Sequence, residues 1–176
     1  MKRVTILIAV MCLPLFTQAA EISVNLDRLA VLNDQDDLSA ESKLAMHFAL
    51  PEEISQRQII YAEMVIDIPV APPGADSLFE LLLFPLTSDW QEENIDYEGS
   101  ETITDSVLVG AKMIKLGESE VFRIDITPFV KNVVSGARAN YGLIAMADLL
   151  GDYNLRIPGD LGGPMRNAAR VRVVYR

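Results

Sequence analysis

Apolar and polar residues alternate along most of this chain with the period of two that is typical of half-buried β-strands. The clearest case is the segment 43–50, in which Leu44, Met46 and Phe48 point to one face while Lys43 and His47 point to the other. The same pattern predicts further strands at 22–26, 28–32, 59–70, 78–86, 107–116, 120–126, 141–145 and 168–175. The chain is therefore predicted to consist mainly of short strands.

The segment 123–145 predicts one short helix between two strands. Thr127 can cap the first turn, and Pro128 suits the first helical position because its missing N–H is not needed there. Gly136 is placed to end the helix, and Gly142 is predicted to occupy a position where a side chain would clash or strain the backbone. The apolar stripe that would face the core consists of Val130, Val133 and Val134.

Many closely spaced strands, joined by loops rich in Pro, Gly and Asp and accompanied by one short helix, favour an all-β fold, specifically an antiparallel β-sandwich of jelly-roll type. Segments 107–116 and 120–126 are expected to pair as a hairpin around Gly117 and Glu118. No internal repeat or low-complexity linker divides the chain. Residues 20–176 are therefore predicted to form a single domain.

Residues 1–19 have the pattern of a secretory signal peptide, because Lys2 and Arg3 precede an apolar run over 4–16 and small residues follow it. The run is shorter than the roughly 20 residues of a membrane-spanning helix. We expect cleavage after Ala19 and a mature chain without a transmembrane segment, secreted to the periplasm, the cell surface or the extracellular space.

Loss of the leader would remove two of the 15 Lys and Arg residues and the single cysteine, leaving 13 basic against 25 acidic residues, a net charge of −12. Stability would then depend on apolar burial rather than on disulfides. The negative charge argues against nucleic acid and anionic membranes as partners, and favours cations, neutral glycans or basic proteins. The alternative is that acidity only keeps an exported protein soluble.

Four blocks of the sequence together resemble the DNRLRE-domain family, which overlaps carbohydrate-binding module family ninety-six. They are H-F-A-L-P-E-E-I with the following I-I-Y-A-E-M-V-I-D-I, L-T-S-D-W-Q-E-E-N-I-D-Y at 86–97, the segment 125–143, and R-N-A-A-R-V-R-V-V-Y at 166–175. Val134 and Tyr97 stand where the family often has tryptophan. The resemblance implies a β-jelly roll at cell surfaces or attached to polysaccharide-active enzymes, with binding rather than catalysis as its role.

Candidate catalytic residues are few. His47 is the one histidine and is expected to be a solvent-facing strand residue, so triads based on histidine and zinc sites of the common His/Cys kind have too few members. Neighbouring carboxylates such as Glu92 and Glu93 do not by themselves define the facing pair that glycoside hydrolysis needs. We expect no enzyme, and a polysaccharide-active enzyme is the remaining alternative.

Calcium is the one cofactor that the sequence suggests. Oxygen side chains are concentrated at 33–37, where Asn33, Asp34, Asp36 and Asp37 could supply ligands of the kind that calcium prefers. The segment lacks the glycine and the terminal glutamate of an EF-hand loop. The alternative is a solvated turn whose side chains hydrogen-bond their own backbone.

Candidate sugar-binding residues are aromatic and polar. Trp90 is the only tryptophan and could stack on a sugar ring, or alternatively close an edge of the sandwich as part of the core. Tyr153, in a loop bordered by Gly and Pro, is the more exposed candidate, with Asn154 and Arg156 nearby. The sequence thus predicts a secreted, non-catalytic module that binds polysaccharide, or alternatively a structural or adhesive surface component that assembles with other proteins.

Overall fold

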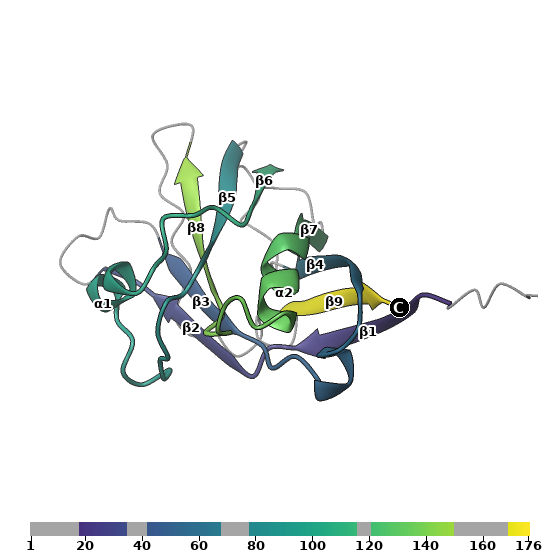
Figure 1. Cartoon of the computed structure of the whole chain (residues 1–176). Helices are drawn as coiled ribbons and strands as arrows, with labels where there is room; N and C mark the ends of the chain where they lie inside the picture. Colours follow the sequence, from purple (N-terminus) through teal and green to yellow (C-terminus); the bar gives the residue numbers. More distant parts are fainter. Residues whose placement is uncertain (1–17, 35–41, 68–77, 116–120, 150–168) are drawn as a thin grey trace, which may run out of the picture.

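The computed structural model describes residues 18–34, 42–67, 78–115, 121–149 and 169–176, which form nine strands, two α-helices and one 3-10 turn (Figure 1). The strands are β1 (Ala20–Asn25), β2 (Arg28–Leu32), β3 (Lys43–His47), β4 (Ile59–Asp67), β5 (Leu78–Pro85), β6 (Gly110–Lys115), β7 (Val121–Asp125), β8 (Leu143–Leu149) and β9 (Ala169–Tyr175). The helices are α1 (Tyr97–Thr102) and α2 (Thr127–Val134), and the 3-10 turn is η1 (Glu52–Ile54).

The strands form two antiparallel sheets. The four-stranded sheet has the order β1-β9-β4-β7, and the five-stranded sheet has the order β2-β3-β8-β5-β6. Apolar residues from both sheets fill the space between them, including Met64 and Val171 from the first sheet and Met46 and Leu83 from the second. The predicted antiparallel β-sandwich is therefore confirmed, while its jelly-roll variant stays a prediction.

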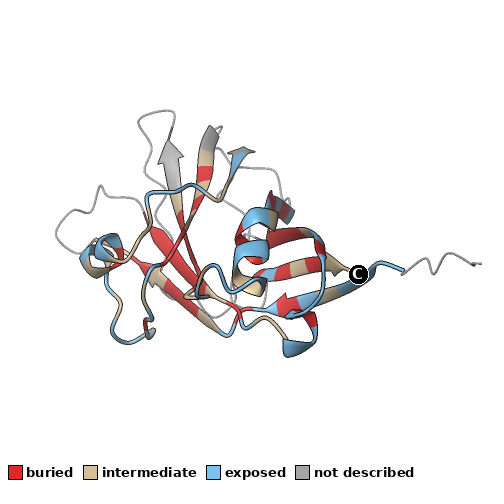
Figure 2. Cartoon of the chain, viewed as in Figure 1, coloured by how far each residue is buried: buried red, intermediate tan, exposed pale blue. Residues whose placement is uncertain are grey.

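The alternating pattern correctly predicts which residues of β7 belong to the core. In β7 the burial alternates strictly, with Phe122 and Ile124 buried and their neighbours exposed. Figure 2 shows buried residues along the strands of both sheets and on α2. Helix α2 adds Phe129, whose ring meets that of Phe48 edge to face at a centroid distance of 6.1 Å. The helix thereby joins the core at one side of the sandwich.

The predicted hairpin between β6 and β7 is wrong. Strand β6 pairs with β5 at the end of the five-stranded sheet, whereas β7 pairs with β4 at the end of the other sheet. The two edges pass close together, because a Cβ atom added at Gly110 would lie 2.7 Å from the carbonyl oxygen of Asp125. The chain therefore crosses from one sheet to the other between these strands.

The expected cap at Thr127 is also wrong, since the N-cap position of α2 is Ile126 and the Thr127 N–H itself donates to the Asp125 carboxylate at 2.8 Å. The Thr127 hydroxyl oxygen instead accepts a hydrogen bond from the backbone N–H of Ala62 at 2.9 Å and lies 3.2 Å from the Ala62 carbonyl oxygen. Strand β7 ends at Asp125, and Ile126 still donates its backbone N–H to the Ala62 carbonyl oxygen at 2.9 Å, so the Thr127 side chain adds a second bond to the same residue of β4. Thr127 therefore holds the helix against the sheet rather than closing its first turn.

The sequence predicted one helix, and the described residues contain a second, α1. Asp96 caps it by accepting a hydrogen bond from the Gly99 N–H at 2.6 Å. The helix lies at the opposite end of the molecule from the carboxyl terminus (Figure 1). It belongs to residues 86–105, called the cover segment below.

Candidate functional site

The cover segment packs on the outer face of the five-stranded sheet and creates a second, smaller core there. Its buried residues come from both partners: Ala30, Leu32, Ala45 and Ile144 from the strands, and Leu86 and Trp90 from the cover segment. Ile95, Tyr97 and Ile103 are partly buried against them. This explains why residues 43–46 are all buried although the alternating pattern predicted one exposed face.

Three cations from neighbouring elements hold the cover segment in place. Lys43 places its Nζ 2.7 Å from a Glu101 carboxylate oxygen and 3.6 Å from the centre of the Tyr97 ring. Arg28 donates to a carboxylate oxygen of Asp89 at 2.9 Å, and Arg138 forms an ion pair with Asp105. Because each cation comes from outside the segment, these pairs tie the segment to the sandwich.

A hollow lies between α1 and the chain that leads into it. Its volume is about 290 Å³, close to the lower end of the range of small-molecule sites. We call it the Trp90 hollow, and it is lined by Asp89, Trp90, Gln91, Asn94, Ile95, Gly99 and Ile103. The lining combines a carboxylate and two carboxamides with an indole and two aliphatic side chains, which is a mixture suited to a sugar ring.

Trp90 forms an inner wall of this hollow rather than an open platform. The residue is only 5% exposed, and its indole N–H donates to the carbonyl oxygen of Tyr141 at 2.9 Å. The Arg28 guanidinium carbon lies 5.0 Å from the centre of the Trp90 ring. Of the two roles that the sequence leaves open for Trp90, the structural one describes its position, because core packing and Arg28 occupy the ring.

Asp89 is the charged acceptor at the hollow, with a side chain that is 62% exposed. The hydrogen bond from Arg28 lowers the pKa of Asp89 below its usual value, so that the carboxylate is ionised at neutral pH. The side chains of Gln91 and Asn94 form no hydrogen bond within the described part of the chain. One carboxylate and two amides are thus available to a ligand.

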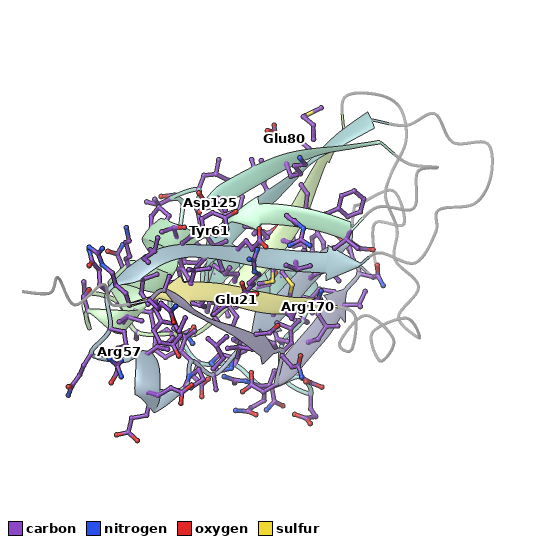
Figure 3. All side chains as sticks on the ribbon, turned by 90° about the vertical axis from the view of Figure 1, so that its right-hand side faces the viewer. Glu21, Arg57, Tyr61, Glu80, Asp125 and Arg170 are labelled. Atoms are coloured by element: carbon purple, nitrogen blue, oxygen red, sulfur yellow. The ribbon has the colours of Figure 1, made fainter. Side chains whose placement is uncertain are left out.

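The outer face of the four-stranded sheet carries a separate charged network, viewed in Figure 3 with Glu21 and Tyr61 labelled. At its centre the buried Glu63 accepts hydrogen bonds from Arg123 at 2.6 Å, from Arg172 at 3.0 Å and from Tyr61 at 3.0 Å. Burial opposes ionisation of Glu63, but these hydrogen bonds outweigh it, so that its pKa is lowered. Because Glu63 lies on β4, Arg123 on β7 and Arg172 on β9, this network ties three strands together.

A second depression, the Gln56 groove, lies between the end of α2 and the chain before β4. Its volume is about 490 Å³, and its polar lining includes Gln56, Arg57, Lys131 and Asn132. Glu52 and Glu53 line the adjoining depression. The side chains of Gln56 and Asn132 are exposed amides like those of the Trp90 hollow. The groove therefore offers a matched control site for binding experiments.

Several predicted site residues lie outside the described residues: Tyr153, Asn154 and Arg156 of the expected sugar-binding loop, and Asp36 and Asp37 of the expected calcium site. Of the remaining calcium candidates, Asn33 has a side-chain oxygen 2.5 Å from the Ser42 hydroxyl, and Asp34 is partly buried. Across the described ranges no group of three or more His, Cys, Asp or Glu could hold a metal ion. Calcium binding stays a prediction.

His47 is not the solvent-facing residue that the sequence predicted. Its side chain is 12% exposed, and Nδ1 lies 2.7 Å from a carboxylate oxygen of Asp27. The other ring nitrogen lies 3.3 Å from the carbonyl oxygen of Asn140. The imidazole thus joins the link between β1 and β2 to the turn before β8, a contact that the alternating pattern could not show.

No model of a known protein family matches this chain, and no curated protein matches it either. Among the described residues, none of the helices has the length and apolar character needed to cross a membrane.

Proposed function

We propose that this chain is an exported, non-catalytic β-sandwich module that binds extracellular or cell-surface polysaccharide through the Trp90 hollow. The observation that carries the proposal is the set of unpartnered amides of Gln91 and Asn94 beside the ionised Asp89. Sugar hydroxyls donate to carboxylates and both donate to and accept from carboxamides. The aliphatic side chains of Ile95 and Ile103 offer apolar contact to the C–H face of the ring.

The position of these groups supports binding without large rearrangement. The hydrogen bond from Trp90 to Tyr141 and the contacts of Arg28 fix one wall, and the Asp96 cap fixes the start of α1. A site whose groups are already in place loses less conformational entropy when it binds a ligand. The small volume suits one sugar residue of a longer chain, so we expect weak affinity for each site.

A glycan array probed with the purified protein tests this proposal, followed by affinity measurements on two double variants. Gln91→Ala with Asn94→Ala should weaken binding by about tenfold or more, because each lost hydrogen bond contributes about 0.5–1.5 kcal/mol. Gln56→Ala with Asn132→Ala removes the same chemical groups from the Gln56 groove and should leave affinity unchanged. Absence of binding to every glycan, or an equal effect of both pairs, contradicts the proposal.

The alternative, a surface component that assembles with other proteins, is supported by a different observation. Four of the five exposed large apolar residues in the described part of the chain occur between positions 107 and 121, on or before the edge strands β6 and β7: Val107, Leu108, Met113 and Val121. Exposed apolar edges favour association. Sedimentation velocity tests this alternative, which requires association that Leu108→Asp weakens.

A further inference from the structure

Cations without an ion pair gather at the Gln56 groove. Within the described residues, five lysine and arginine side chains form no ion pair: Arg57, Lys112, Lys131, Arg170 and Arg176. Arg57 and Lys131 are exposed and line the groove, and Arg176 donates from Nε at 2.6 Å to the side chain of Gln58, which also lines it. Among the described residues the lining includes no Asp or Glu, because Glu52 and Glu53 belong to the adjoining depression.

The cover segment presents a surface of the opposite charge. Between positions 89 and 105 there is no lysine or arginine, and five exposed residues are acidic: Asp89, Glu93, Asp96, Glu98 and Glu101. The cations that pair with Asp89 and Glu101 are Arg28 and Lys43, whose side chains are only 19% and 7% exposed. These cations therefore lie beneath the acidic groups, and the surface of the cover segment is mainly anionic.

Two of these carboxylates are available for a partner. Glu93 lies in the turn before α1, and Glu98 lies in the first turn of the helix. Neither side chain forms an ion pair or a hydrogen bond with another residue in the described part of the chain. Both are exposed, so they could contact cations of another molecule without breaking a bond of their own.

The basic and the acidic surface lie at opposite ends of the molecule. Helix α1 is far from the carboxyl terminus in Figure 1, whereas Gln58 of the groove exchanges two backbone hydrogen bonds with Arg176, at 3.0 and 3.1 Å. The two surfaces therefore cannot meet within one chain, but they can meet between two copies. A chain of net charge −10 repels a second copy in most orientations, and this repulsion favours the orientation that brings the groove to the cover segment.

We infer that this protein associates head to tail, with the cover segment of one copy in the Gln56 groove of the next. Arg57 and Lys131 pair there with Glu93 and Glu98 of the second copy, because a guanidinium binds a carboxylate through two parallel hydrogen bonds and an ammonium acts as a point charge. Since the contact joins two different surfaces, each copy keeps one groove and one cover segment for further copies, and the assembly grows as a chain. The inference goes beyond sugar binding and does not depend on it.

Sedimentation equilibrium of the purified protein tests this contact in about 0.1 M salt, where repulsion beyond about 10 Å is screened. The groove variant carries Arg57→Gln and Lys131→Gln, and the cover variant carries Glu93→Gln and Glu98→Gln. Each should weaken self-association about tenfold, because each removes the charges of one side of the contact. Lys112→Gln with Arg170→Gln is the matched control, since it removes the same charge outside the groove, and it should leave association unchanged.

A mixture of the two variants tests the head-to-tail geometry itself. The groove variant keeps its cover segment, and the cover variant keeps its groove, so the mixture retains one complete contact. It should form complexes that contain one chain of each variant and grow no further. The unaltered protein should instead form larger assemblies as its concentration rises.

Four results would overturn the inference. The first is an unaltered protein that stays monomeric up to about 1 mM, which leaves the sugar-binding proposal untouched. The second is a mixture of the two variants that associates no better than either variant alone. The third is a cover variant that associates more strongly than the unaltered protein, because total charge would then control association. The fourth is association that both variants keep and Leu108→Asp abolishes, which would assign the contact to the exposed apolar edges.

Discussion

Replacement of Trp90 tests whether the cover segment is held by a true core. The ring is 5% exposed and packs with Ala45, Leu86 and Ile144 in the smaller core, and its N–H donates to Tyr141. Trp90→Ala removes this ring and leaves the Tyr141 carbonyl without its partner. Truncation of a buried aromatic costs about 3–5 kcal/mol, and the lost hydrogen bond is part of that cost.

Urea denaturation followed by circular dichroism measures the effect. With a slope of about 2 kcal/mol/M, a loss of about 4 kcal/mol lowers the midpoint by about 2 M. Trp90→Phe is the matched control, because it keeps an apolar ring and removes the N–H, and it should cost about 1–2 kcal/mol. A midpoint for Trp90→Ala within about 0.5 M of the unaltered protein would refute the assignment of Trp90 to a core.

Other positions give further tests. Gly142 has φ +92° and no room for a Cβ atom beside β3, whereas Gly136 has φ +73° and open space around it. Gly142→Ala should therefore destabilise the protein clearly more than Gly136→Ala in the same urea assay. Because folding lowers the pKa of Glu63, the ionised carboxylate stabilises the folded protein at neutral pH, and this stabilisation is lost as pH falls below about 4.5. Glu63→Gln should therefore make the melting temperature less dependent on acid pH. An unchanged dependence would argue against the network. Thr127→Ala should cost about 1–2 kcal/mol through the lost bond to Ala62, and an unchanged urea midpoint would contradict that role.

Several strands could be predicted because a strand with one buried face alternates apolar and polar residues along the sequence. In β7 and β9 one face meets the core and the other meets solvent, so alternation marks both strands in the sequence. In β3 the alternation of burial fails because the cover segment buries the second face. The signal available in the sequence was the small residue Ala45 opposite the larger apolar side chains.

Pairings between distant segments could not be predicted in the same way. Strands β6 and β7 are neighbours in sequence, which favoured a hairpin, yet they are edge strands of different sheets. Which partner each strand takes depends on its contacts, of β6 with β5 and of β7 with β4. The alternation of apolar residues and the residues of the turn do not indicate these partners. The same holds for Thr127, whose residue type predicted a cap but whose partner is Ala62, 65 positions earlier.

The candidate site was predicted in part. The sequence singled out Trp90, and the acidic residues around it were visible, but the role of Arg28 depends on a contact across 61 positions. Asn94 lies near Trp90 in the sequence, but only the structure shows that its side chain lines the hollow. A hollow forms only when the cover segment folds onto the sheet, so no pattern along the chain identifies its lining.

The most direct test of the account is an NMR titration of the protein with a mixture of neutral cello-, manno- and xylo-oligosaccharides. If the Trp90 hollow binds the sugar, the largest amide shifts should fall between residues 89 and 103. They should be lost in the variant that carries Gln91→Ala and Asn94→Ala, and should persist in the variant that carries Gln56→Ala and Asn132→Ala. The largest shifts at residues 55–59 and 131–135, or no shifts at millimolar oligosaccharide, would contradict the account.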